Sequence, residues 1–172
     1  QQHRIRAEAR APLSSEVTPD AFLHWLTEWD DAPRTSAKKW IISRKYVPGL
    51  GNGYVQEILW RARIHPRRKM NTLSRSEAIT LMTCTQNVVR EALEQGGRQA
   101  ERDLFDQPGG FETALNKDTV NGPCPACGTI IEKFSFEGGA CYIWPVCQPL
   151  SPERQETLED QREANLFHAP QD

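Results

Sequence analysis

The sequence predicts a mainly α-helical fold, in which a bundle of helices is followed by a small β-hairpin module. Helical periodicity is clearest over residues 75–95, where apolar side chains recur every three or four positions. After residue 122 the pattern changes to that of short strands. Four of the five cysteines lie in this last part, and three of them have a spacing typical of a metal site.

The first three helices are predicted from their ends. Thr18 is the N-cap of the first helix, since a threonine hydroxyl can accept a bond from the first turn. A second helix is predicted over residues 36–45 and a third over residues 51–64. Pro66 ends the third helix, because proline disfavours helical geometry in the residue before it.

The fourth helix has the clearest limits in the sequence. Ser74 and Glu77 form a capping-box pattern at its start. Gly96 and Gly97 close it, because glycine adopts the left-handed conformation that ends many helices. We therefore predict one long helix over residues 75–95.

Glycines and bases surround the third helix. Gly51, Asn52 and Gly53 stand at its N-terminus, where unpaired N–H groups and a partial positive charge attract anions. Glycines also let a phosphate approach the backbone closely. The basic run Arg67-Arg68-Lys69 follows the helix. These residues are candidates for phosphate binding; the alternative is a tight connection followed by solvated surface bases.

The last part of the chain predicts a hairpin with a metal knuckle. Residues 128–136 and 138–143 fit two strands. Cys124 and Cys127 form a C-x-x-C pair before them, and Cys147 follows them. Thiolates at such spacings bind zinc, and a small hairpin needs such a staple because it buries little core. An odd cysteine count favours a reducing compartment over a disulfide framework.

Three motifs in chain order carry a resemblance to a known family. They are Gly49-Leu50-Gly51-Asn52-Gly53-Tyr54 with Ile64-His65-Pro66, the earlier segment Pro12-Leu13-Ser14 with Thr18-Pro19-Asp20 and Phe22, and the later Cys124–Gly128 knuckle with Pro145-Val146-Cys147-Gln148. The first resembles the helix–two-turn–helix signature of the formamidopyrimidine-DNA glycosylase / endonuclease VIII family. The second is similar to the segment that opens that family's C-terminal domain, and the third to its terminal zinc finger. The resemblance covers residues 12–148 and only the C-terminal part of such an enzyme.

The resemblance implies binding of damaged double-stranded DNA. Asn52 and the backbone of its two glycine neighbours would grip the phosphate beside the lesion, with Lys45 close by. The implied organisation is a linker (1–15), a helix–two-turn–helix domain (16–97), a loop region (98–122), a zinc-finger hairpin (123–149) and a disordered acidic tail (150–172). By the resemblance the loop region would cap the extruded base; from its residues alone it is an ordinary connection.

The resemblance also exposes a defect in the metal site. The family pattern has a cysteine at position 144, where this chain has Trp144. Three outcomes follow: Cys141 serves as the fourth ligand, zinc is held by three thiolates and another group, or the finger contains no metal and Trp144 fills the space. A second departure is at the hairpin tip, where glycines replace the arginine that meets phosphate in the formamidopyrimidine-DNA glycosylase branch.

The catalytic residues of the family have no counterpart in this chain. By the resemblance, an N-terminal proline amine attacks the sugar and a glutamate assists, but the sequence begins Gln1-Gln2-His3. We therefore expect a DNA-binding half whose partner is an N-terminal catalytic domain or subunit. The alternative is an inactive relic that binds protein or RNA as a structural subunit. A complete enzyme with different catalysis is a third option.

The charge distribution permits a nucleic-acid partner. The net charge is −2, but six acidic and two basic side chains fall within residues 151–172, so the rest of the chain carries +2. No apolar run is long enough to span a bilayer, so we expect no membrane partner. We expect an intracellular protein, in the cytoplasm or nucleoid if the source is bacterial.

Overall fold

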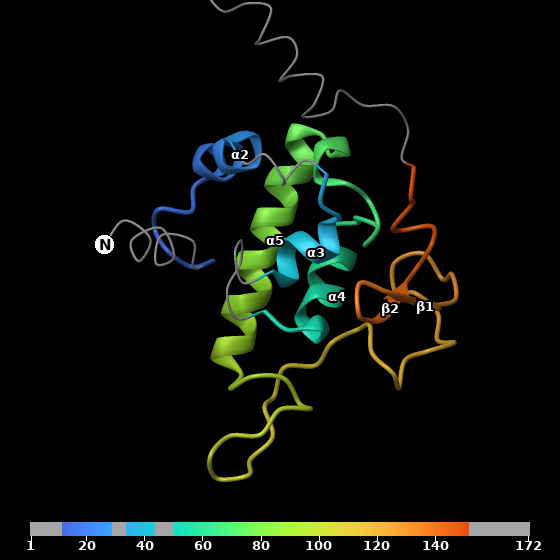
Figure 1. Ribbon diagram of the computed structural model, residues 1–172. Helices are drawn as coiled ribbons and strands as arrows, with labels where there is room; N and C mark the ends of the chain where they lie inside the picture. The colour runs from blue at the N-terminus through green and yellow to red at the C-terminus, as the bar shows by residue number, and fades with distance from the viewer. Residues whose placement is uncertain (1–11, 29–33, 44–49, 152–172) are drawn as a thin grey trace, which may run out of the picture.

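The computed structural model describes residues 12–28, 34–43 and 50–151, which form a helical bundle with a hairpin beside it (Figure 1). The elements are α2 (Pro19–Glu28), α3 (Ala37–Ile42), α4 (Asn52–Arg61), the 3-10 helix η1 (Met70–Thr72), α5 (Arg75–Glu94), β1 (Glu132–Phe136) and β2 (Gly139–Ile143). The described part thus has the predicted order of helices followed by a two-stranded antiparallel hairpin. The predicted linker and acidic tail fall almost entirely outside these residues.

The long helix α5 lies at the centre of the bundle. It contacts α2 and α4, while α4 also contacts α3 and strand β2 (Figure 1). Ile58 of α4 and Leu81 of α5 are fully buried in the core between these helices. None of the described helices combines the length and the apolar character needed to cross a bilayer.

The ends of α5 confirm the predicted signals. Ser74 accepts a hydrogen bond from the Glu77 amide at 3.2 Å, and the Glu77 carboxylate accepts one from the Ser74 amide at 2.8 Å. This reciprocal pair is the predicted capping box. At the other end, Gly96 has φ +72° and the Gly97 amide bonds to the Ala92 carbonyl at 2.7 Å. The helix therefore stops where the two glycines predict it.

Helix α4 ends three residues earlier than the sequence predicts. Arg63 takes a left-handed conformation with φ 58°, which is uncommon for a residue with a side chain. Its amide bonds to the Trp60 carbonyl and the Ile64 amide bonds to the Leu59 carbonyl, both at 2.9 Å. These two hydrogen bonds form the pattern of a helix C-terminal cap, with arginine at the position where glycine is usual.

The hairpin has a two-residue turn and its own small core. Glu137 and Gly138 both have positive φ (51° and 74°), as the tightest antiparallel connections require. Phe136 pairs with Gly139 across this turn. Behind the hairpin lies a second apolar cluster, in which the buried Trp144 ring lies 4.9 Å from the ring of Trp60 on α4. An aromatic pair thus connects the hairpin module to the helical bundle.

A buried ion pair fixes the segment between α4 and α5. The Arg68 side chain is only 2% exposed, and its Nη2 donates to Glu77 Oε2 at 3.0 Å and to the Thr72 carbonyl at 2.7 Å. Burial raises the pKa of Glu77, but the bonds from Arg68 and Ser74 outweigh that effect and the net shift is downward. The charged pair therefore belongs to the folded architecture.

Replacing Arg68 by methionine should cost about 2–4 kcal/mol of unfolding free energy, because it leaves the Glu77 carboxylate without its partner. This loss of unfolding free energy is smaller than that for a fully buried ion pair, since 22% of the Glu77 side chain is exposed. Urea denaturation at neutral pH measures the change. The control is Arg75→Ala, whose ion pair with Asp20 is 54% and 91% exposed and should contribute less than about 1 kcal/mol. Equal destabilisation of the two variants would contradict a structural role for Arg68.

Candidate nucleic-acid interface and metal centre

The N-terminus of α4 presents free backbone amides. Gly51 is the N-cap and makes no side-chain capping bond, while its carbonyl accepts from the amides of Tyr54 and Val55 at 3.1 and 3.2 Å. The first two helical amides, of Asn52 and Gly53, have no acceptor among the described residues. Two N–H donors and the partial positive charge of the helix are thus available to an anion.

The Asn52 side chain faces the hairpin. Its Nδ2 donates to the Ala140 carbonyl at 3.1 Å, and its buried Oδ1 has no partner among the described residues. Gln56, one turn further along α4, donates to the same carbonyl at 2.6 Å and accepts from the Tyr142 amide at 3.2 Å. Asn52 therefore links α4 to β2, and its backbone amide, rather than its side-chain amide, is the donor left for phosphate.

A buried lysine that sequence reasoning did not single out completes this contact. Lys38 of α3 is 1% exposed, and its Nζ donates to the Phe136 carbonyl at 2.6 Å and to the Gly139 carbonyl at 3.3 Å. We call the set of donors Lys38, Asn52 and Gln56, with their hairpin carbonyl acceptors, the hairpin clamp. The clamp uses three polar side chains that would otherwise be available to a ligand.

The basic segment after α4 lies on the hairpin. Arg67 is exposed, and its guanidinium carbon lies 4.6 Å from the ring centre of Phe134 and 5.3 Å from that of Phe136. The His65 ring stacks on Phe134 at 5.7 Å with an interplanar angle of 12°. Two aromatic rings thus hold the Arg67 charge at the surface, where a guanidinium can still meet a phosphate.

The other predicted bases differ in their availability. Lys69 is exposed, and its backbone pairs with Ser36 in an isolated bridge. Arg68 is buried against Glu77, so its guanidinium is used inside the fold. Lys45 lies outside the described residues. Arg67 and Lys69 are thus the two predicted bases that the structure leaves open to a ligand.

A further arginine lies at the start of α4. A Cβ atom built on Gly53 would lie 1.4 Å from Nη1 of Arg98, so the absence of a side chain at Gly53 makes room for this guanidinium. The Nε of Arg98 lies 3.2 Å from Glu101, and its guanidinium carbon lies 5.2 Å from the ring centre of Tyr54. Arg98 thus places a guanidinium, paired with Glu101, beside the first two helical amides of α4, and its neighbours in the sequence do not indicate that placement.

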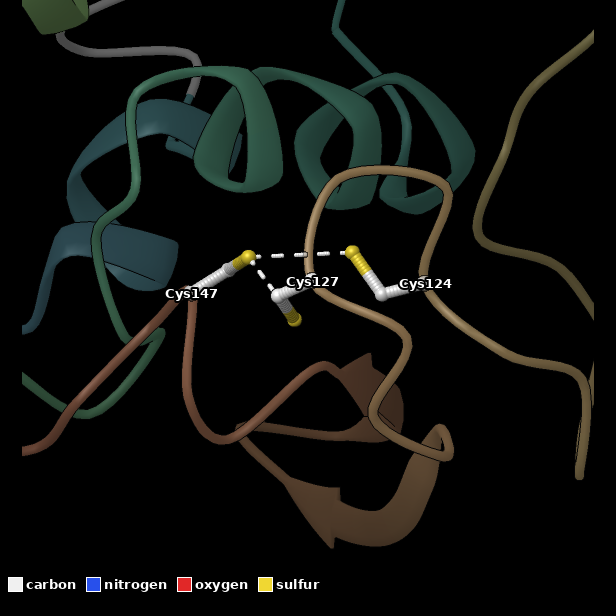
Figure 2. Close-up of side chains that lie close together, drawn as sticks. All are labelled: Cys124, Cys127 and Cys147. Carbon is white, nitrogen blue, oxygen red and sulfur yellow. Dashed lines mark hydrogen bonds between the residues drawn. The ribbon is translucent and has the colours of Figure 1, made fainter.

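Three cysteines converge at the base of the hairpin (Figure 2). The Sγ atoms of Cys124 and Cys147 are 3.6 Å apart, and those of Cys147 and Cys127 are 3.3 Å apart. All three sulfurs lie within 4.8 Å of one another. Such a group of thiolates can hold a soft or borderline metal ion.

The structure does not bring Cys141 into this thiol cluster. Cys141 is fully buried in β2, opposite Phe134, and is absent from the group that Cys124, Cys127 and Cys147 form among the described residues. The position where the resemblance expects a cysteine is also closed, because Trp144 is 1% exposed and packs on Trp60. The described residues therefore offer three thiolates and no fourth ligand of the usual kinds.

The three thiols lie in different environments. Hydrogen bonds from the Thr129 side chain and backbone lower the pKa of Cys127 to about 7. Burial raises the pKa of Cys147 to about 12, and its thiol neighbours add to that shift. The exposed Cys127 thus loses its proton more readily than Cys147, which would need a bound cation to ionise near neutral pH.

Comparisons with known proteins decide the family. Residues 9–103, more than half of the chain, match the formamidopyrimidine-DNA glycosylase H2TH domain. This chain belongs to the formamidopyrimidine-DNA glycosylase family. A formamidopyrimidine-DNA glycosylase of Rhodococcus jostii is 36% identical over 124 residues, which cover 70% of this chain and 42% of the relative. One from Bacillus cereus is 33% identical over 141 residues, which cover 80% and 50%.

Solved members of the glycosylase family have the same fold. MutM (Fpg) from Thermus thermophilus superposes with a TM-score of 0.73 at 30% identity, over 88% of this chain and 59% of that one. Lactococcus lactis Fpg, solved with DNA containing an abasic site, gives 0.71 at 25% identity over 86% and 54%. This chain spans about half the length of the relatives that it matches.

A neutral His65 side chain helps to fix the backbone of the basic segment that contains Arg67. The His65 Nδ1 accepts a hydrogen bond from the Arg67 amide at 3.1 Å, which requires that nitrogen to be unprotonated. Burial lowers the pKa of His65 from 6.5, and the charges of Arg67 and Arg68 lower it further. Because the folded pKa is depressed, this histidine's contribution to stability is complete above pH 6.5 and is lost as pH falls through the folded pKa.

We expect the unfolding free energy to be smaller at about pH 5.5 than at about pH 7.5, and we expect His65→Gln to remove part of that difference. Urea denaturation at the two pH values measures both effects. If His65→Gln kept the full dependence, the assignment to His65 would be incorrect.

Proposed function

We propose that this chain is the DNA-binding half of a base-excision-repair glycosylase and abasic-site lyase. Its ligand would be double-stranded DNA that is damaged or lacks a base. The observation that carries the proposal is the pair of free amides at the glycine-lined start of α4, in a chain that belongs to this family. Donors at a helix N-terminus suit a phosphate, and phosphate contacts position a duplex without reading its sequence.

In this proposal, exposed basic side chains add affinity for DNA. Arg67 and Lys69 are exposed on the segment that follows α4, and Arg98 lies against Gly53 at its start. Each basic side chain that reaches a DNA phosphate releases counterions, so DNA binding should weaken as the salt concentration rises. We assign Arg68 to the architecture, since its charge is paired inside the fold. Lys45 stays a candidate from the family resemblance.

The chemistry would come from an N-terminal catalytic domain or subunit. This division is consistent with the chain spanning 42–50% of the length of two glycosylases that it matches. The chain itself would supply grip and orientation, and the loop over residues 98–122 would lie over the extruded base. A protein with this role would work inside the cell, where the DNA is.

A second candidate is a structural or interaction subunit with little DNA affinity. The observation that favours it is the hairpin tip, which carries the acidic Glu137 and two glycines and no base. The hairpin clamp also engages Lys38, Asn52 and Gln56 with hairpin carbonyls. Such a subunit would bind protein or RNA instead of a damaged duplex.

Fluorescence anisotropy with a labelled duplex containing an abasic analogue separates the two candidates. The DNA-binding proposal expects salt-sensitive binding that is tighter than binding to an intact duplex. Arg67→Ala and Lys69→Ala should each weaken it. Each should also lower the slope of log affinity against log salt by about 0.9 for every phosphate that the variant no longer neutralises.

The matched control is Arg75→Ala, which removes the same charge from a residue that pairs with Asp20 of α2. It should leave the salt slope unchanged. If no duplex binds at low salt while circular dichroism shows a folded protein, the DNA-binding proposal fails and the interaction subunit is favoured. Trapping with borohydride on abasic DNA tests the remaining option of catalysis by this chain alone, which we expect to give no adduct.

A further inference from the structure

The thiol cluster is a triangle that comes from two separate segments. Cys124 and Cys127 belong to one turn, which is closed by the Gly128 amide bonding to the Cys124 carbonyl at 2.8 Å. Cys147 comes from the segment after β2, where the Gln148 amide bonds to the Trp144 carbonyl at 2.9 Å. Two separate turns thus hold the three sulfurs within 4.8 Å of one another, at separations that one metal ion can span.

The described residues offer no fourth ligand to this triangle. Among the described cysteine, histidine, aspartate and glutamate residues, only these three cysteines group together. Cys141 is buried in β2, in an environment shared with Lys38 and Gln56. Trp144 holds the expected fourth position with an indole, whose only nitrogen carries a hydrogen and cannot bind a metal. Its ring packs on Trp60.

One side of the cluster opens to solvent. Cys124 and Cys147 are 3% and 4% exposed, whereas Cys127 is exposed. The Thr129 hydroxyl lies 2.9 Å from Cys127 Sγ, and hydroxyls can stabilise a thiolate by donating a hydrogen bond. An ion held by the three sulfurs would thus have two buried ligands and a third that borders water.

We propose that the cluster is a three-thiolate metal site with an exchangeable fourth position. It would hold one zinc-class ion through Cys124, Cys127 and Cys147, with the remaining position taken from solution by water, an imidazole or a small thiol. Closed structural zinc sites use four protein ligands, and sites with three protein ligands bind an external fourth. This site would therefore exchange its metal more readily than a four-cysteine finger would.

Cobalt(II) spectroscopy tests the proposal directly, because the visible spectrum of cobalt reports the ligands around it. The full chain, stripped of metal under reducing conditions, is titrated with cobalt and then with imidazole. We expect sulfur-to-cobalt charge-transfer bands on cobalt addition and a shift of the ligand-field bands when imidazole is added. A spectrum that imidazole does not change would overturn the proposal, since it would indicate a site already filled by the protein.

Two cysteine variants identify the ligands. Cys127→Ser should weaken cobalt and zinc binding by at least about 100-fold, because changes one shell further out already cost about 10–100-fold. Cys141→Ser is the matched control, since it removes a buried thiol outside the cluster, and it should bind as the unmodified chain does. Loss of binding in Cys141→Ser would overturn the proposal and make Cys141 the fourth ligand.

A third variant restores the missing ligand. Trp144→Cys should bind zinc at least about 100-fold more tightly than the unmodified chain, and its cobalt spectrum should no longer respond to imidazole. If this variant does not fold, the imidazole response and the cysteine variants still decide. Absence of cobalt or zinc binding by the folded, reduced chain would overturn the proposal in favour of a metal-free finger stabilised by Trp144. None of these measurements depends on DNA binding.

Discussion

The hairpin clamp is the contact on which the relation of the two modules depends. A buried ammonium is costly unless it is well paired, and the Lys38 ammonium donates to the carbonyls of Phe136 and Gly139 at the hairpin turn. The carbonyl of Ala140 in turn accepts from both Asn52 and Gln56. Each side thus supplies what the other lacks, and separation of the modules would exchange these hydrogen bonds for bonds to water. The same hairpin also positions Arg67, because its guanidinium lies over the rings of Phe134 and Phe136.

The clamp also changes which atoms can meet a phosphate. From the sequence, the side chain of Asn52 is the obvious ligand, since it stands between two glycines at a helix start. In the fold that side chain bonds to Ala140, while the backbone amide of the same residue has no acceptor within the described part of the chain. A similar division affects the basic run, where Arg68 stabilises the fold and its neighbours face solvent. Within residues 67–69, the proposed DNA binding would therefore use two charges where the sequence suggests three.

Features that depend on neighbouring residues could be predicted, whereas those that depend on distant partners could not. The capping box at Ser74, the glycine stop of α5 and the cysteine triad each follow from spacing within short segments. Lys38 gave no signal, because its acceptors lie about a hundred residues further along the chain. The same holds for Arg98, which becomes notable only once Gly53 is known to face it. The end of α4 was missed for a different reason, because Arg63 adopts a conformation that sequence rules reserve for glycine.

The tryptophan pair has a consequence for how this molecule can be followed in solution. The rings of Trp60 and Trp144 lie 4.9 Å apart at 57°, with one on the helical bundle and the other on the hairpin module. Two indoles at that separation couple their electronic transitions, so their near-ultraviolet circular dichroism and emission depend on their remaining together. The chain thus carries an intrinsic optical reporter of whether the hairpin stays docked on α4, and no label need be attached.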